Sequence, residues 1–187
     1  MPENPVWLDN AECCPSPNCD ERAADEQISL LVIHNISLPL GKFGGPWITD
    51  LFLNRLDPGA DPYFEEIANL KVSSHLLIRR DGELVQYVPL NMRAWHAGVS
   101  NYCGREACND FSIGIELEGT DETPYTDEQY RRLVDVTIEI MEIYPAITPK
   151  QITGHSDIAP GRKTDPGPAF DWKKYQEMLR EEPKHSV

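Results

Sequence analysis

The chain has 187 residues, a length that suits one domain and allows roughly 70% of the unfolded surface to be buried. Its 17 basic residues against 31 acidic ones leave a formal net charge of −14, which repels nucleic acid and anionic lipid, so neither is an expected partner. No apolar run is long enough to span a membrane, and the acidic, proline-containing start lacks the features of an export signal. We therefore expect a cytoplasmic protein.

The five cysteines are odd in number and lack the CxxC spacing of common metal sites. A chain of this length needs no disulfides to be stable, so we expect free thiols, as in a reducing cytoplasm. A zinc knuckle built from Cys13, Cys14 and Cys19 is the alternative, but adjacent cysteines followed by Pro15 make poor chelators.

Residues 1–27 are rich in acids and interrupted by prolines, which predicts an irregular arm on the domain surface. Residues 28–33 form an apolar, β-branched run typical of a buried strand, and this run leads into His34 and Asn35. A histidine at the end of a strand is well placed to face a cleft.

Glycines and prolines over residues 38–46 predict a mobile loop, and its position directly after the first histidine suggests a lid over that side chain. Residues 47–55 predict a helix. Three of its side chains are expected to pack inward: Trp47, Leu51 and Leu53.

The clearest local signal is a pair of alternating runs, residues 74–80 and 83–88, joined at Asp81-Gly82. Asp-Gly between two such runs predicts a β-hairpin.

Residues 109–118 also alternate, with apolar side chains on one face of a predicted strand, so Glu116 is expected on the opposite, polar face. Further along, Thr126 and Gln129 form the capping box of a predicted helix whose apolar residues recur at steps of three and four, and Pro145 ends it.

Residues 152–168 are rich in Gly and Pro and predict an irregular segment, and residues 172–179 predict a closing helix. Strands and helices mix without regular βαβ alternation, so we expect a single α/β (α+β) domain with a mixed central β-sheet flanked by helices. The expected division is an arm over residues 1–27, the domain over residues 28–180 and a polar tail over residues 181–187.

Of the five histidines, His185 in the tail is expected to be inert. No His-Glu-x-x-His pair places two ligands on one helix, and no nucleophile elbow or phosphate-binding loop is complete. The chemical candidates that remain are His155 and Asp165 with Lys163 between them, plus the distant His34 and Glu116.

Two imidazoles and one carboxylate are a common catalytic zinc set, because three ligands leave a fourth position for water or a carbonyl oxygen. A free carboxylate near that water and a cation near the developing oxyanion complete a hydrolase. On spacing alone, the alternative that Lys163 and Asp165 form a surface ion pair stays open.

Several longer motifs occur in one order between about Leu30 and Trp172. They include Leu30-Leu-Val-Ile-His-Asn-Ile-Ser-Leu-Pro39, Gly44-Gly-Pro-Trp47, Arg93-Ala-Trp-His-Ala-Gly98, Asn109-Asp-Phe-Ser-Ile-Gly-Ile-Glu-Leu-Glu-Gly119, Thr153-Gly-His155 and Arg162-Lys-Thr-Asp-Pro-Gly-Pro168. By these motifs the chain resembles the AmpD family, zinc-dependent N-acetylmuramoyl-L-alanine amidases of the amidase-2 or peptidoglycan-recognition fold.

The resemblance implies that His34, His155 and Asp165 bind one Zn²⁺ per chain, that Glu116 is the general acid/base, and that Lys163 stabilises the oxyanion. It implies a monomer that hydrolyses the amide between N-acetylmuramic acid and L-alanine of a small-molecule muropeptide. The 1,6-anhydro form is the expected substrate, in cytoplasmic peptidoglycan recycling.

The resemblance also implies that Asn35, Trp95, His96 and Lys71 contact substrate. Lys71 and Ala107 stand where the family carries Arg. Arg binds a carboxylate through two hydrogen bonds and Lys does not, so these departures bear on the affinity for the stem peptide and on its preferred length.

Two alternatives remain: a lytic amidase acting on intact murein, and a non-catalytic peptidoglycan-binding module, which typically lacks part of the zinc set that is complete here.

The net charge also needs an explanation, because the expected substrate carries carboxylates. Residues 71–105 hold five basic residues against two acidic ones, so we expect a locally positive field around the site.

Overall fold

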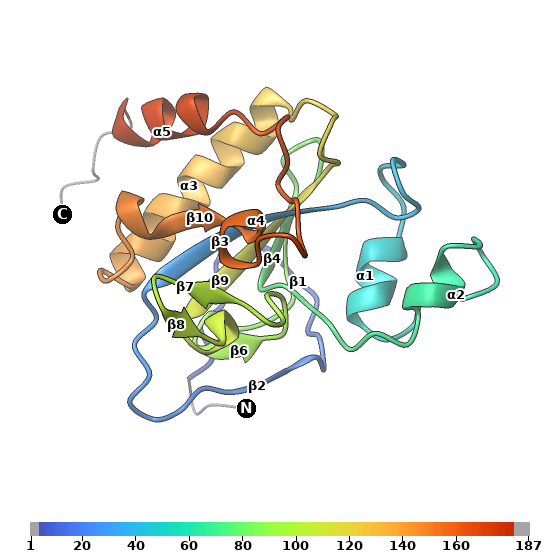
Figure 1. Cartoon of the computed structure of the whole chain (residues 1–187), viewed down its shortest axis with the longest axis horizontal. Helices are drawn as coiled ribbons and strands as arrows, with labels where there is room; N and C mark the ends of the chain where they lie inside the picture. The colour runs from blue at the N-terminus through green and yellow to red at the C-terminus, as the bar shows by residue number, and fades with distance from the viewer. Residues whose placement is uncertain (1–3, 182–187) are drawn as a thin grey trace.

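The centre of the molecule is a six-stranded mixed sheet, seen in a computed structural model that describes residues 4–181 (Figure 1). Its strands are β1 (Glu12–Cys13), β3 (Leu30–Ile36), β4 (Leu76–Ile78), β5 (Leu84–Gln86), β9 (Ser112–Glu118) and β10 (Ile152–Gly154). They lie in the order β1-β5-β4-β9-β3-β10, and only β4–β5 is an antiparallel pair.

Smaller elements surround this sheet. Two short sheets pair β2 (Cys19–Glu21) with β6 (Met92–Ala94) and β7 (Asn101–Tyr102) with β8 (Arg105–Glu106). The helices are α1 (Trp47–Phe52), α2 (Phe64–Ile67), α3 (Asp127–Ile143), α4 (His155–Ile158) and α5 (Trp172–Glu181), with 3-10 turns at Cys108–Asp110 and Pro149–Gln151. The fold class expected from the sequence is confirmed.

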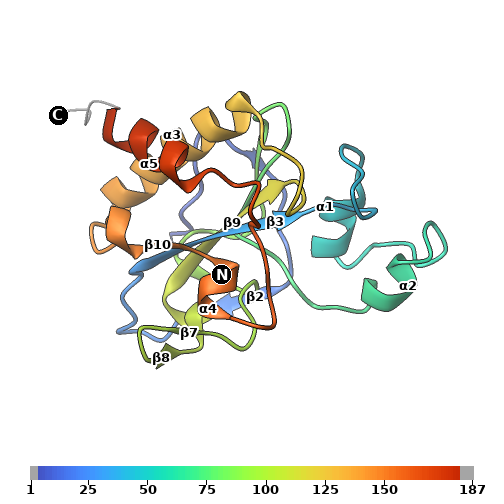
Figure 2. The same cartoon turned by 45° about the horizontal axis from the view of Figure 1, so that its top comes forward.

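One face of the sheet is covered by α3 and α5, which lie side by side in both views (Figures 1 and 2). Side chains of β3, β4 and β9 pack there against the apolar side of α3 in the largest core cluster. The helix begins as expected, because the Thr126 hydroxyl accepts a hydrogen bond from the Gln129 backbone and the Gln129 side chain accepts one from the Thr126 backbone.

The other face carries two separate apolar clusters. One lies under α1 and α2 and includes Leu77 of β4 and Val85 of β5, and the other joins Val32 of β3 to Ile158 of α4. Strand alternation puts His34 on the same face as Val32, and Glu116 on the same face as Gly114. The polar side chains therefore lie between two apolar clusters on this face.

Register brings two candidate residues side by side. β3 and β9 are parallel, and His34 is the Cα partner of Glu116 near the carboxyl ends of both strands. Gly154, the last residue of β10, pairs with Ile33, so His155 follows at the level of His34. Carboxyl ends of parallel strands are a common location for ligand sites in α/β sheets.

The sequence predicted an irregular segment over residues 152–168. This prediction is wrong in part, because the segment contains β10 and α4. Three residues are too few for a local pattern to specify a strand, and β10 is held by pairing with β3, which is distant in sequence. The Asp157 carboxylate then accepts a hydrogen bond from the Gly154 backbone at 3.0 Å and starts the short helix.

Other predicted elements are present with shifted bounds. The hairpin forms between β4 and β5, and the predicted strand 28–33 becomes β3, which continues past His34. The first helix ends at Phe52, and its buried side chains are Ile48, Leu51 and Phe52, whereas Trp47 and Leu53 are only half-buried.

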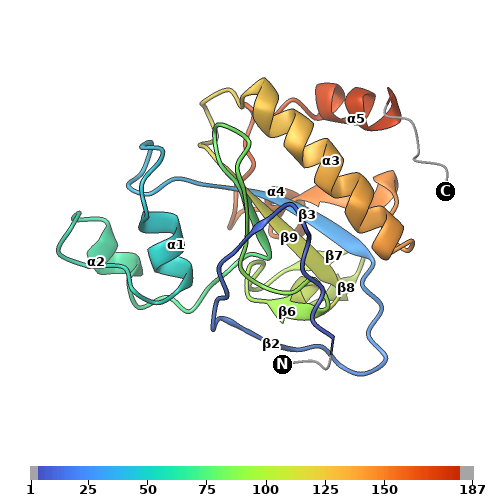
Figure 3. The same cartoon turned by 180° about the vertical axis from the view of Figure 1, so that it is seen from behind.

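The N-terminal arm contains two short strands that the sequence did not predict. β1 extends the sheet beside β5 and β2 pairs with β6, so the arm follows the surface of the domain (Figure 3). Its division from the domain stays a prediction. Most of the expected tail, residues 182–187 with His185, lies outside the described residues. Within residues 4–181 no helix is long and apolar enough to cross a membrane.

Candidate active site and metal centre

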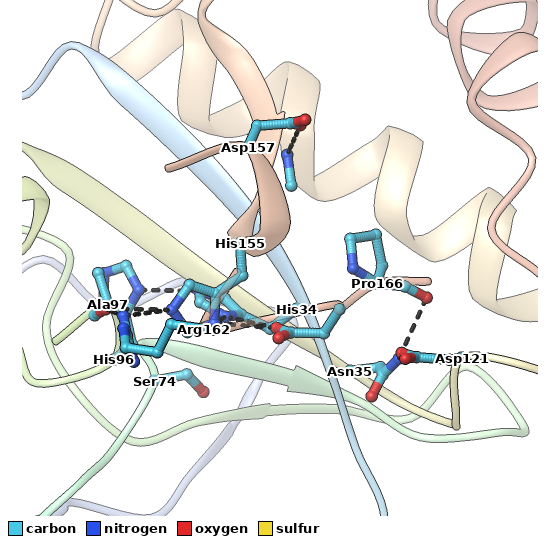
Figure 4. A network of polar contacts seen from close by, with 12 residues as sticks. His34, Asn35, Ser74, His96, Ala97, Asp121, His155, Asp157, Arg162 and Pro166 are labelled. Carbon is cyan, nitrogen blue, oxygen red and sulfur yellow. Dashed lines mark hydrogen bonds and ion pairs between the residues drawn. The ribbon is translucent and has the colours of Figure 1, made fainter. Parts of the chain in front are cut away.

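Three candidate metal ligands, His34, His155 and Asp165, converge on one point. Figure 4 labels the two histidines. The Nδ1 atoms of His34 and His155 lie 2.9 Å apart, and the Asp165 Oδ2 atom lies 3.1 Å from the first and 3.0 Å from the second. His34 comes from β3, His155 begins α4, and Asp165 lies in the loop after α4. Among residues 4–181 no other group of His, Cys, Asp and Glu converges in this way, and all five cysteines are free, as expected.

This triangle of acceptor atoms fits a small cation. Ligand atoms about 2.0–2.1 Å from a tetrahedral zinc ion are about 3.3 Å from one another, so the observed separations are close to that requirement. Neutral imidazole nitrogens and a carboxylate oxygen all present lone pairs, which repel each other unless they share a cation or a proton.

The second ring nitrogen of each histidine is also bonded. His155 Nε2 donates to the Ala97 carbonyl at 3.0 Å, and His34 Nε2 lies 2.9 Å from His96 Nδ1. A partner at Nε2 orients the ring and leaves the Nδ1 lone pair for a metal. Arg162 holds the backbone of residues 97–99 in place, because its side chain donates to the carbonyls of Ala97 at 2.6 Å and Val99 at 2.7 Å.

Burial acts on His34, and contacts act on Asp165, to keep these two side chains in their metal-binding protonation states. Burial lowers the pKa of His34 to about 4, and contact with Asp165 only partly opposes this shift. Burial works to raise the pKa of Asp165, but its contacts with His155 and His34 outweigh that effect and the pKa is lowered. At neutral pH His34 is therefore neutral and Asp165 ionised.

Glu116 is the buried carboxylate beside this triangle. It is 9% exposed, and its Oε2 atom has no hydrogen-bond partner among the described residues. Burial and the charge of Asp165 raise its pKa well above the usual range, and Lys163 acts in the opposite direction. A buried carboxylate with an unpartnered oxygen and a raised pKa holds a proton more readily than an exposed one, which suits a group that accepts and returns a proton.

These residues line an open cavity of about 630 Å³. Lys163, which is exposed, contributes to its wall, as do Asn35, Trp95 and the start of the 38–46 loop. A second cavity, of about 590 Å³, lies between the arm and the end of α3, and no histidine lines it. The structure therefore brings all five proposed metal and catalytic residues to one cavity.

The predicted substrate contacts differ in how they are placed. Asn35 donates to Asp121 at 2.9 Å and to the Pro166 carbonyl at 3.1 Å, which leaves its amide oxygen for a ligand. Trp95 donates its indole N–H to Asp20 at 3.2 Å. Lys71 is exposed and is not part of the described cavity lining, and neither is Ala107, the other position that departs from the family pattern.

His96 borders the cavity, but neither of its ring nitrogens is free. Nδ1 faces His34, and Nε2 lies 3.1 Å from the Ser112 hydroxyl. Sequence reasoning missed Ser112 and the two residues that hold nearby groups, Asp20 and Arg162. One signal was available, because Gly114 in the middle of a central strand indicates close approach by another group, and a Cβ there would lie 2.5 Å from His96 Nδ1.

The expected positive field around the site is largely neutralised. Arg93 pairs with Asp20 and Asp110, and Arg105 pairs with Glu26. Arg79 likewise contacts two glutamates, Glu83 and Glu118. Two of these acids belong to the arm, whose fold back onto the domain could not be derived from composition. The exposed cations left beside the cavity are Arg162 and Lys163.

Comparison with known proteins finds relatives over most of the chain. The sequence model of the N-acetylmuramoyl-L-alanine amidase family matches residues 24–168. The 1,6-anhydro-N-acetylmuramyl-L-alanine amidase AmpD of Enterobacter cloacae is 65% identical over 173 residues, 92% of each chain. A crystal structure of a selenomethionine AmpD derivative has a TM-score of 0.91 at 60% identity and covers 96% of this chain and 99% of its own.

A more distant structure carries a ligand. It is a complex of the N-acetylmuramyl-L-alanine amidase AmiD from E. coli with the substrate anhydro-N-acetylmuramic acid-L-Ala-D-gamma-Glu-L-Lys. Its TM-score is 0.59 at 30% identity, over 84% of this chain and 60% of that chain.

Three converging ligand atoms beside a buried, unpartnered carboxylate are the arrangement typical of hydrolases that use a bound metal. The matched family model and the high identity over most of the chain then identify the family within this class of enzymes. The chain belongs to the N-acetylmuramoyl-L-alanine amidase family, a family of enzymes that hydrolyse amides.

Proposed function

We propose that the protein is a zinc enzyme that hydrolyses the amide between N-acetylmuramic acid and L-alanine of a stem peptide, with a preference for the 1,6-anhydro form. The observation that carries the proposal is the triangle of His34, His155 and Asp165 beside the unpartnered Glu116 oxygen in one open cavity. The name of the Enterobacter relative and the ligand of the AmiD complex support the choice of substrate.

One zinc ion per chain is the metal that this donor set favours, since two imidazoles and one carboxylate leave a fourth position open. When bound, zinc supplies Lewis-acid polarisation of the scissile carbonyl and lowers the pKa of water. His34, His155 and Asp165 are the residues that hold it.

Glu116 acts as the general base and then as the general acid. Its unpartnered Oε2 takes a proton from the attacking water while the water oxygen bonds to the carbonyl carbon. It then passes that proton to the alanine nitrogen as the carbon–nitrogen bond breaks. The products are the lactyl carboxylate of the muramic acid and a peptide with a free amino end.

Lys163 opposes the negative charge that develops on the carbonyl oxygen during this attack. Its charge already influences Glu116 and His34, and its side chain borders the cavity. Asn35 and Trp95 bind the substrate in the cavity, the first by its amide oxygen and the second by packing of the indole. Lys71 contacts the stem peptide outside the described lining.

The remaining parts of the proposal concern setting and organisation. We place the activity in the cytoplasm, in peptidoglycan recycling, and assign it to a monomer. The catalytic domain is residues 28–180, flanked by the arm and the tail.

The proposal is tested by metal analysis and a substrate comparison. Purified protein is expected to hold about one zinc per chain and to release alanyl peptide from anhydro-muropeptide faster than from polymeric murein. Chelated protein serves as the matched control and should regain turnover on addition of zinc. Faster turnover of the polymer would overturn the recycling assignment, and binding without turnover in the zinc-loaded protein would indicate a recognition module.

A further inference from the structure

A chain of polar contacts runs from the metal centre into the protein. His34 Nε2 lies 2.9 Å from His96 Nδ1, and His96 Nε2 lies 3.1 Å from Ser112 Oγ. The rings of His34 and His96 meet edge to face (Figure 4). Both nitrogens of His96 are therefore used inside the protein, and a substrate in the cavity can meet only its carbon atoms.

The position of one proton along these three side chains determines whether His34 Nδ1 has a lone pair free for a metal. A neutral imidazole carries its proton on one nitrogen only. When His96 accepts at Nδ1, His34 carries its proton on Nε2 and presents a lone pair at Nδ1. When His96 instead carries its proton on Nδ1, the His34 proton moves to its own Nδ1, where it points into the ligand triangle.

Ser112 can serve both of these arrangements. Its hydroxyl can accept a hydrogen bond from His96 Nε2–H, which leaves His96 Nδ1 as an acceptor for His34, or it can donate to an unprotonated His96 Nε2. The other ligand has no such dependence, because His155 Nε2 donates to the Ala97 carbonyl, and a carbonyl can only accept. The two metal-binding histidines are thus fixed in different ways.

The position of His96 is itself built by the surrounding chain. Its backbone N–H and that of Ala97 both donate to the Asn109 side-chain oxygen, at 3.1 and 2.8 Å. Its ring lies against Gly114 of the central strand, where a Cβ would be 2.5 Å from Nδ1. Any larger residue at position 114 displaces this ring.

We propose that His96 is a positioning residue for the metal centre: it accepts a hydrogen bond from His34 Nε2–H when His34 Nδ1 binds the metal and so fixes the His34 ring, and Ser112 holds the His96 ring by its other nitrogen. This rests on the proposed metal site and changes the role given to His96 from substrate contact to support of a ligand. Partners of this kind typically contribute about tenfold to 100-fold in metal affinity.

The experiment measures zinc affinity of the full chain by competition with a chelating dye, without substrate. His96→Leu removes the acceptor and is expected to raise the zinc Kd by about tenfold to 100-fold. His96→Asn places an amide oxygen near the former Nδ1 and is expected to recover most of this loss. Ser112→Ala is expected to raise the Kd by several-fold. The matched control is Ser100→Ala, which removes a buried serine hydroxyl that does not contact His96, and it should leave the Kd unchanged.

A second readout does not depend on metal. Nitrogen-15 NMR of histidine side chains in the metal-free protein is expected to show a shifted His34 Nε2 signal in His96→Leu, which lacks the hydrogen-bond partner, and an unshifted one in Ser100→Ala. Wild-type zinc affinity in His96→Leu would overturn the proposal, as would an unchanged His34 Nε2 signal in that variant. A wild type that binds no zinc, with the expected Nε2 shift in His96→Leu, would refute the proposed function and leave this series of contacts supported.

Discussion

At the scale of single residues, Glu116 owes its character to its neighbours on two strands. Its Cα partners are His34 on β3 and Leu77 on β4. Leu77 belongs to an apolar cluster and removes water from one side, whereas the other side opens to the cavity. Desolvation from one side and access from the other are the conditions that a proton-transferring carboxylate needs.

Replacement of this carboxylate should separate metal binding from catalysis. Glu116→Ala is expected to keep about one zinc per chain and to lose hydrolysis of anhydro-muropeptide by about 100-fold to 10,000-fold, because the proton acceptor is gone. Metal analysis and initial rates on the same samples measure both. Full activity in a zinc-loaded variant would remove the role given to Glu116.

A second buried residue, His75, predicts how stability depends on pH. The ring is fully buried: Nδ1 accepts from the Gly114 backbone and Nε2 donates to the Met92 carbonyl, both at 3.0 Å. Burial, with a smaller effect of the Arg22 charge, lowers its pKa to about 3.

The unfolded chain takes up this proton near pH 6.5 and the folded chain only near pH 3, so the folded state binds fewer protons between them. The contribution of His75 to the free energy of unfolding is complete above about pH 6.5 and falls as the pH drops, by at most about 1.4 kcal/mol per pH unit. In metal-free protein, urea unfolding between about pH 6 and pH 4.5 should therefore show a shallower decline for His75→Asn than for the wild type. Equal slopes would refute the assignment.

At the scale of elements, strand β2 of the arm supports the cavity from outside. Its residue Asp20 accepts from the Trp95 indole and from two nitrogens of Arg93, and the Arg93 hydrogen bond is the main reason for its lowered pKa. The arm thus fixes the orientation of a side chain that is proposed to touch substrate.

Asp20→Ala is expected to raise the KM for anhydro-muropeptide by about threefold to tenfold, as expected when a hydrogen bond to a charged group is lost, with little change in kcat. The matched control is Glu26→Ala. It removes the other paired acid of the arm, whose carboxylate contacts Arg105 and not the Trp95 indole. Steady-state kinetics of both variants and of the wild type give the KM and kcat values to compare. An equal rise in KM for both would assign the effect to net charge rather than to Trp95.

The elements also show what local sequence can specify. The β4–β5 hairpin, β9 and the capped helix α3 were predicted because their signals lie within a few residues. β1, β2 and β10 were missed because two or three residues carry no pattern, and their pairing partners are distant in sequence. Likewise, alternation alone placed Glu116 on the polar face, whereas the contacts of Asp20 and Ser112 depend on how the whole chain folds.

At the scale of the whole molecule, the proposed zinc ion joins segments that are far apart in the chain. His34 and Asp165 are separated by 131 positions, and His34 and His155 by 121. Since these ligands meet only in the folded state, metal binding adds directly to the free energy of unfolding.

Removal of zinc should therefore lower thermal stability. With free zinc at about 100 times its Kd, the metal contributes about 2.7 kcal/mol, which corresponds to about 5–10 °C in Tm for a chain of this size. Differential scanning calorimetry before chelation, after it and after return of zinc measures the effect, with magnesium as the control ion. An unchanged Tm in protein shown to lose and regain zinc would contradict the ligand assignment.

The central strand β9 is buried along its whole length, with apolar side chains on one face and Ser112, Gly114 and Glu116 on the other. For protein engineering, this means that the strand has no position free for variation. A deletion of one residue would exchange the two faces, so that a carboxylate entered the core and an isoleucine replaced it in the cavity. Libraries meant to alter substrate preference are better directed to the loops that border the cavity, such as residues 38–46, whose side chains are mostly exposed.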